Sequence, residues 1–142
     1  MDIQNSYRKI IEIMKNILEE IAARTRERIA KEKSRISVSE LENRIQEVNK
    51  NARQKITFLQ ALQKDGMSYI CEVKKASPSK GLIAPNFPYL AIAKEYEQAG
   101  ASAISCLTEP FYFQGADQYL REIAAAVQIP VLRKDFTVDE YM

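Results

Sequence analysis

The first half of the chain repeats hydrophobic residues at the spacing of amphipathic helices. One stripe recurs every three to four positions and consists of Ile10, Ile13, Met14, Ile17, Leu18 and Ile21. Glu12, Lys15, Glu19 and Glu20 face away from this stripe, so the pattern predicts a first helix of about 25 residues. Ser37 begins an N-cap pattern, and a second helix is predicted from Leu41 to Ile56. Thr57 is placed to cap a third, short helix that ends before Gly66.

The pattern changes after Gly66. Short apolar runs then alternate with helical patterns, which predicts strand 68–73, helix 89–100, strand 101–108, helix 116–128 and strand 129–136. Strands that alternate with helices at this spacing form parallel sheets with right-handed crossovers. The long loops all follow strands, so the sequence predicts an α/β fold with functional loops at the carboxyl ends of its strands.

Composition and charge narrow the class of protein. The 142 residues carry 21 basic and 19 acidic side chains, a net charge of +2, which gives no general electrostatic case for a nucleic-acid or membrane partner. Residues 1–66 are net basic, whereas residues 67–142 are net acidic. No apolar run reaches the roughly 20 residues that cross a bilayer, and we expect a cytoplasmic protein. Cys71 and Cys106 lie in apolar runs and are expected to be buried free thiols.

Charged residues at the ends of apolar strands are the candidate chemical groups. The chain contains no histidine, so proton transfer has to use Lys, Glu, Asp, Ser or Tyr. Glu72 and Lys74 are two positions apart and leave the same face of their strand, and Lys134 shares a face with Leu132. These residues either converge in a site or form a solvated ion pair, and the pattern alone favours neither interpretation.

Three motifs resemble one enzyme family. They are EVKKASPSKG at 72–81, LTEPFYFQG at 107–115 and VLRKDF at 131–136, and an upstream segment at 17–33 fits as well. In their order and spacing they resemble indole-3-glycerol phosphate synthases. The resemblance implies a (β/α)8 TIM barrel with a helical N-terminal extension. It also implies a lyase of tryptophan biosynthesis that closes the ring of 1-(2-carboxyphenylamino)-1-deoxyribulose 5-phosphate with loss of carbon dioxide and water. The expected partner is this phosphorylated small molecule, and no metal or organic cofactor is expected.

The resemblance also assigns expected roles to single residues. Lys134 matches the general acid on the substrate's ketone oxygen. Lys74 matches a lysine that contacts the substrate carboxylate and is also discussed as a proton donor, so the division of work between the two amines stays open. Glu72 matches the glutamate that positions them.

Three further positions match substrate-binding residues of the family. Phe113 and Phe136 match aromatic residues that flank the anthranilate ring, although from the pattern alone both would be core residues. Ser77 matches a polar loop position near the substrate, and its simpler interpretation is a turn former beside Pro78. Four other charged residues are expected to be exposed or to act through neighbouring side chains: Lys75, Lys80, Arg133 and Asp135.

The predicted elements cover only part of such a barrel. We expect a helical extension over 1–66 and a truncated barrel with strands 1 to 3 over 67–142. The family's further catalytic Glu and Asn and its phosphate-binding loops have no counterpart, so the chain alone is expected to be inactive. An open sheet edge would also permit self-association. Two alternatives remain: another phosphate-handling barrel enzyme, and a non-catalytic module that binds a partner through its helices.

Overall fold

A computed structural model describes residues 3–51 and 56–142, and it describes side chains from residue 17 onward except those of residues 49 and 51. The predicted apolar positions Ile10, Ile13 and Met14 therefore lie outside the described side chains. The chain divides into two compact units. The helical unit comprises Met1–Ala52 and Phe136–Met142, and the sheet unit comprises Arg53–Asp135. The two units meet between residues 52 and 53 and between residues 135 and 136, and the predicted domain boundary at residue 66 stays a prediction.

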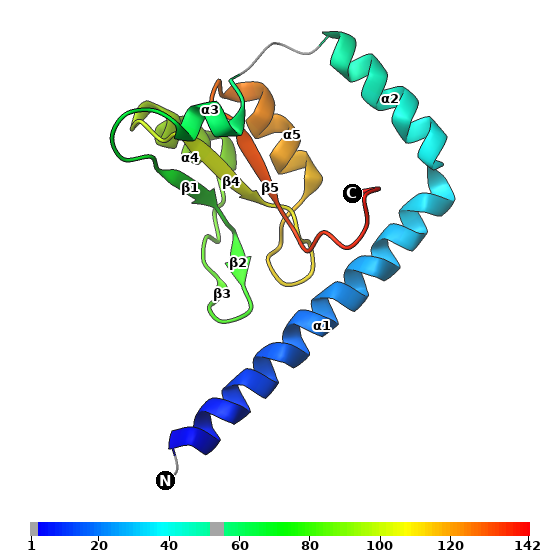
Figure 1. The fold of residues 1–142 in the computed structure, drawn as a ribbon, viewed down its shortest axis with the longest axis vertical. Helices are drawn as coiled ribbons and strands as arrows, with labels where there is room; N and C mark the ends of the chain where they lie inside the picture. Colours follow the sequence, from blue (N-terminus) through cyan, green and yellow to red (C-terminus); the bar gives the residue numbers. More distant parts are fainter. Residues whose placement is uncertain (1–2, 52–55) are drawn as a thin grey trace. The chain divides into compact units, whose positions relative to one another are not determined.

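The helical unit contains two helices and the last residues of the chain (Figure 1). Helix α1 spans Ile3–Arg35, which is longer than predicted, and α2 spans Val38–Asn51. The Ser37 hydroxyl accepts the Glu40 N–H at 3.2 Å, which confirms the predicted cap. The prediction that α2 continues to Ile56 was wrong, because Ile56 lies outside any helix. Among the described residues, no helix combines the length and the apolar content needed to cross a bilayer.

The sheet unit begins with helix α3, Phe58–Leu62, which is capped as predicted. The Thr57 hydroxyl accepts the Gln60 N–H at 3.1 Å, and the Gln60 side chain accepts the Thr57 N–H at 2.8 Å. This reciprocal pair satisfies two backbone donors at the helix start.

Three parallel strands form the sheet in the order β1-β4-β5. They span Ile70–Val73, Ala103–Leu107 and Val131–Lys134. Helices α4 (Tyr89–Gln98) and α5 (Asp117–Ala126) connect them, so the predicted α/β order is confirmed. The described residues form no closed barrel.

A short hairpin lies in the region expected to be an irregular loop. Strands β2 (Ala76–Ser77) and β3 (Gly81–Leu82) pair antiparallel. Figure 1 shows this hairpin and the loop between β4 and α5 at the carboxyl ends of the sheet strands. These two loops are therefore placed where α/β proteins carry their functional residues.

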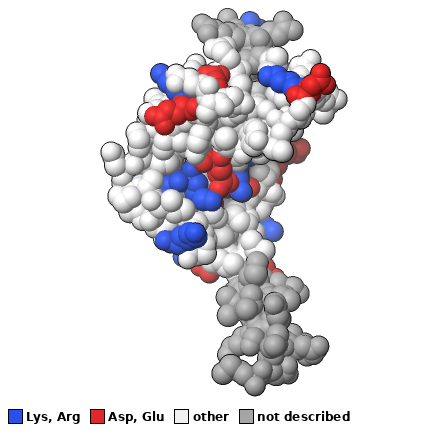
Figure 2. All heavy atoms as spheres, turned by 90° about the vertical axis from the view of Figure 1, so that its left-hand side faces the viewer, with Lys and Arg blue, Asp and Glu red and all other residues white. Residues whose placement is uncertain are grey.

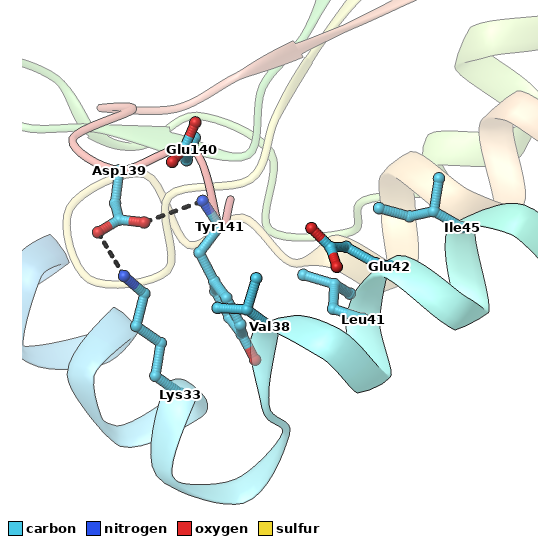
Figure 3. Close-up of a pocket in the computed structure, with 8 residues that line it drawn as sticks. All are labelled: Lys33, Val38, Leu41, Glu42, Ile45, Asp139, Glu140 and Tyr141. Atoms are coloured by element: carbon cyan, nitrogen blue, oxygen red, sulfur yellow. Dashed lines mark hydrogen bonds and ion pairs between the residues drawn. The ribbon is translucent and has the colours of Figure 1, made fainter.

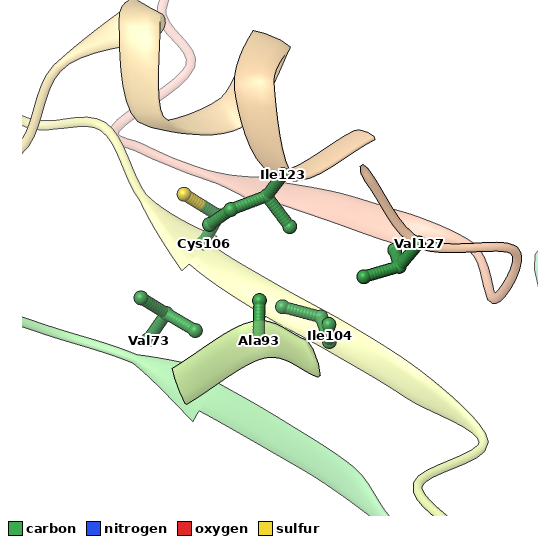
Figure 4. Packing of buried hydrophobic residues seen from close by; sticks show 6 residues of the cluster. All are labelled: Val73, Ala93, Ile104, Cys106, Ile123 and Val127. Atoms are coloured by element: carbon green, nitrogen blue, oxygen red, sulfur yellow. The ribbon is translucent and has the colours of Figure 1, made fainter. Parts of the chain in front are cut away.

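The core of the sheet unit lies between the sheet and helices α4 and α5 (Figure 4). It contains Val73, Ala93, Ile104, Cys106, Ile123 and Val127. All five residues of β4 are buried, as expected for a central parallel strand. Burial raises the pKa of the Cys106 thiol to about 11, with a smaller contribution from Asp117, so this thiol stays protonated and unreactive. Cys71 is half-buried, so the prediction of two buried thiols holds fully only for Cys106.

Candidate functional site

Glu72, Lys74 and Lys134 meet at the carboxyl ends of the strands. The Lys74 ammonium lies 2.5 Å from Glu72 Oε1, and the Lys134 ammonium lies 2.9 Å from Glu72 Oε2. One carboxylate thus bridges an amine from the residue after β1 and an amine from the last residue of β5. The structure therefore brings these three sequence-predicted residues together, and their assignment to a catalytic site stays a prediction.

Strand register explains how Lys134 reaches Glu72. Glu72 is level with Ser105 of β4, whereas Lys134 is level with Leu107. Strands β1 and β5 lie on either side of β4, roughly 10 Å apart at ordinary strand spacing. The four-carbon lysine side chain can span β4 and place its ammonium on the Glu72 carboxylate.

The two lysines lower the pKa of the Glu72 carboxyl group that lies between them. Partial burial raises the pKa of Glu72, but hydrogen bonds from Lys74 and Lys134 and their positive charges outweigh that effect, so its pKa is lowered. Glu72 therefore stays ionised at neutral pH and keeps both amines in place. Figure 2 shows that basic and acidic side chains also lie next to one another on the face that it draws.

The exposure of the three side chains suits contact with a small molecule. Glu72 is 26% exposed, whereas Lys74 and Lys134 are 34% and 52% exposed. Each ammonium carries three N–H donors. The arrangement can therefore bind anionic oxygens and donate a proton to an oxygen on which negative charge develops.

Replacing Glu72 with glutamine tests the coupling of this group to folding. The pKa of folded Glu72 lies below its ordinary value of 4.5, so its stabilising effect is present above that value and is lost as the pH falls through the folded pKa. We expect Glu72→Gln to lower the free energy of unfolding at neutral pH by less than about 1 kcal/mol, because the ion pairs are partly exposed. Urea unfolding should show this difference shrinking in acid.

The matched control is Glu95→Gln on the exposed surface of α4, which removes the same charge away from the lysines. A Glu72→Gln effect that is equal at neutral and acidic pH would contradict the electrostatic explanation.

The loop after β4 contains a residue that sequence reasoning missed. Glu109 is fully buried, and its carboxyl oxygens accept the backbone N–H groups of Phe111, Tyr112 and Phe113. Its signal in the sequence was the first charged residue after the mostly apolar, strand-like run at 101–108. Phe113 lies in this loop and is half-buried, and its carbonyl accepts the Ala76 N–H of β2 at 3.2 Å.

Ser77 and Phe136 are the remaining predicted binding residues. The Ser77 hydroxyl accepts the Lys80 N–H at 3.2 Å, so the expected turn-forming contact is present. Phe136 belongs to the helical unit, whereas the other predicted site residues belong to the sheet unit. The substrate contacts of both residues stay predictions.

Asp135 lies next to Lys134, and its side chain is not exposed to solvent. Its side chain is fully buried and accepts the Thr108 hydroxyl at 2.8 Å and Arg133 at 3.3 Å. Arg133 also contacts Asp117 at 3.1 Å. Of the two roles expected for Asp135, exposure is therefore excluded, and contact with neighbouring side chains is observed.

A separate hollow lies within the helical unit (Figure 3). Its volume is about 550 Å³, and it is lined by Lys33, Val38, Leu41, Glu42, Ile45, Asp139, Glu140 and Tyr141. The Lys33 ammonium pairs with Asp139 at 2.7 Å, and the Tyr141 hydroxyl donates to the Ile36 carbonyl at 2.9 Å. These contacts fix the last residues of the chain to the end of α1. Within the part of the chain that the structure describes, His, Cys, Asp and Glu form no cluster that could hold a metal ion.

Comparison with known proteins agrees with the geometry. The family model for indole-3-glycerol phosphate synthase matches residues 18–142. The indole-3-glycerol phosphate synthase of Ruminiclostridium cellulolyticum is 52% identical over 126 residues, which cover 88% of this chain and 47% of that protein. The synthase of Lacticaseibacillus paracasei is 51% identical, with 89% and 48% covered, and that of Aliarcobacter butzleri is 46% identical, with 88% and 48% covered. The chain spans about half the length of these relatives. With its three motifs and the Glu72 bridge in place, the chain belongs to the indole-3-glycerol phosphate synthase family.

Proposed function

We propose that this chain supplies the Lys-Glu-Lys part of an indole-3-glycerol phosphate synthase site. The observation that carries the proposal is the bridge from Glu72 to Lys74 and Lys134 at the carboxyl ends of β1 and β5. The reaction is the ring closure of 1-(2-carboxyphenylamino)-1-deoxyribulose 5-phosphate to indole-3-glycerol phosphate, with release of carbon dioxide and water, in tryptophan biosynthesis. It makes the complete protein a decarboxylating carbon-carbon lyase that needs no metal or organic cofactor.

Lys134 is the proposed general acid. Negative charge develops on the ketone oxygen as the ring carbon attacks, and an ammonium in a partly dry site stabilises that charge and then transfers its proton. Lys134 ends β5 and is half exposed, so its ammonium can reach a bound molecule while Glu72 holds it. Glu72 acts as the positioning residue of the pair.

Lys74 is the proposed contact for the substrate carboxylate. It follows β1 directly and lies on the other oxygen of Glu72. A carboxylate bound there would bring the anilino ring close to Lys134. Much of the rate gain in such a site comes from holding a flexible molecule in its reactive geometry. Phe113 and Phe136 are proposed to flank the ring, and Ser77 is proposed as a polar contact.

The proposal includes the parts of the fold that the relatives imply. We assign β1, β4 and β5 to the first three strands of an eight-stranded barrel, behind a helical extension. Because the chain spans about half the length of its relatives, turnover is proposed to need the remaining part of the site. The outer strands β1 and β5 leave sheet edges through which the chain is proposed to self-associate. The proposed location is the cytoplasm.

The comparisons bear on the two alternatives. The family match begins at residue 18 and includes α2 and slightly more than half of α1, which favours helices that belong to the enzyme fold over a separate binding module. A barrel enzyme with different chemistry would not require the bridge between Lys74, Glu72 and Lys134.

The decisive experiment is a ring-closure assay on the complete polypeptide that the gene encodes and on the 142-residue chain. Indole absorbance follows the product, and released carbon dioxide provides a second readout. We expect turnover by the complete polypeptide and none by the 142 residues alone. No turnover by the complete polypeptide would overturn the proposed function. Turnover by the 142-residue chain would overturn the claim that it supplies only part of the site.

A further inference from the structure

The Glu109 carboxylate organises the loop between β4 and α5. Its Oε1 accepts the Phe111 N–H at 2.9 Å, and its Oε2 accepts the N–H groups of Tyr112 at 2.7 Å and Phe113 at 3.0 Å. Glu109 itself is 0% exposed. A buried carboxylate needs such donors, so the loop backbone and the side chain stabilise each other.

The remainder of the loop is equally constrained. The Gly115 N–H donates to the Glu109 carbonyl at 2.8 Å and closes the loop. A Cβ at Gly115 would lie 2.5 Å from the Leu107 carbonyl oxygen, so the backbone passes close to β4. Gln114 has a φ of 50°, in the left-handed region that non-glycine residues seldom adopt. The loop therefore has a specific backbone path rather than a generic turn.

Phe113 is held at both of its backbone polar groups. Its N–H donates to Glu109, and its carbonyl accepts the Ala76 N–H at the start of the β2–β3 hairpin. The backbone of Phe113, from which the aromatic ring projects, is therefore held by a buried acid on one side and by the β2–β3 hairpin on the other.

We propose that Glu109 is a positioning residue that acts through Phe113. This inference rests on the proposed function, in which the Phe113 ring flanks the aromatic ring of the substrate. Glu109 does not contact the reacting atoms. It fixes the backbone from which the Phe113 ring projects, so the substrate meets an aromatic surface that is already in place.

Glu109→Gln is the matched variant, because it keeps the size of the side chain and replaces one acceptor oxygen with an NH2 group. That group faces N–H donors and cannot accept from them, so at least one of the three bonds is lost. We expect amide hydrogen exchange at residues 111–113 to become about tenfold faster, as expected for a loop that opens more easily. Glu95→Gln removes a charge from the exposed surface of α4 and should leave this exchange unchanged.

A double-mutant cycle in the complete polypeptide tests the route through Phe113. Glu109→Gln and Phe113→Leu are each expected to lower kcat/KM by about tenfold, since small misplacement of a positioned group has effects of at least this size. The kcat/KM of the double variant should be no lower than that of the less active single variant, because both changes remove the same contact. A purely structural role predicts instead that folded Glu109→Gln keeps kcat/KM within about twofold, or that the two effects add.

The outcomes separate this inference from the proposed function. Inactive wild-type polypeptide would overturn the proposed function, and the inference would then be judged by exchange at 111–113 and by the NMR contacts of the Phe113 ring. Unchanged exchange and an unchanged ring environment in Glu109→Gln would overturn the inference even in an active enzyme. If circular dichroism shows that Glu109→Gln does not fold, Glu109→Asp, which keeps the carboxylate, replaces it. Faster amide exchange at residues 111–113 and a lower kcat/KM are then expected of Glu109→Asp.

Discussion

Replacing Lys134 with methionine in the complete polypeptide is expected to lower kcat for ring closure by roughly 10²–10⁴-fold, the range of a lost general acid. Methionine keeps much of the length and apolar volume of the lysine stem but carries no proton to donate. The change in KM should be smaller, because Lys74 still supplies a cation for the substrate carboxylate. Steady-state kinetics with the indole product as readout measure both constants.

Two further variants separate proton donation from charge. Lys134→Arg keeps a cation near Glu72, but its guanidinium does not release a proton at neutral pH. It is therefore expected to retain the fold and to remain defective in kcat. Lys94→Met removes a lysine from the exposed surface of α4 and should leave kcat within about twofold of wild type, as is usual for surface changes. Ring closure that survives Lys134→Met would show that this amine is not the general acid and would contradict the role proposed for Lys134.

Residue spacing was sufficient to predict that the side chains of Glu72 and Lys74 lie close together. Side chains two positions apart in extended backbone leave the same face, and the contact between Glu72 in β1 and Lys74 directly after it agrees with that geometry. The contact with Lys134 needed more information. It depends on β4 lying between β1 and β5 and on the register of all three strands, which no local pattern specifies. The motif resemblance provided that order before the structure did.

The loops were harder to predict because their structure depends on backbone hydrogen bonds. Glu109 is a charged residue in an apolar context, and only the folded loop shows that three N–H groups surround it. The burial of Asp135 could not be predicted for a related reason. Its partners Thr108 and Arg133 come from two strand ends that meet only in the sheet. Sequence patterns report hydrophobic periodicity well, but they report the satisfaction of buried polar groups poorly.

The tight loops show that two glycines of the sheet unit are required for opposite reasons. Gly100 has a φ of 92°, and nothing lies within 4 Å of the position that a Cβ would take, so its backbone conformation is the constraint. Gly115 is not in the left-handed region, but a Cβ there would lie 2.5 Å from the Leu107 carbonyl oxygen and 2.7 Å from the Thr108 carbonyl carbon. Its constraint is space. The neighbouring atoms belong to the backbone at the end of β4, which cannot move without disturbing the sheet.

Gly115→Ala is therefore expected to lower the free energy of unfolding by about 3 kcal/mol, at the upper end of the usual range for an overpacked site. Urea unfolding followed by circular dichroism measures this change. Gly100→Ala is the matched control and should cost about 1 kcal/mol, the penalty for a left-handed alanine. A Gly115→Ala loss no larger than that of Gly100→Ala would mean that the loop can move away from β4. The loop also carries Glu109 and Phe113. The same movement would therefore contradict the proposal that Glu109 holds the Phe113 backbone in a fixed position.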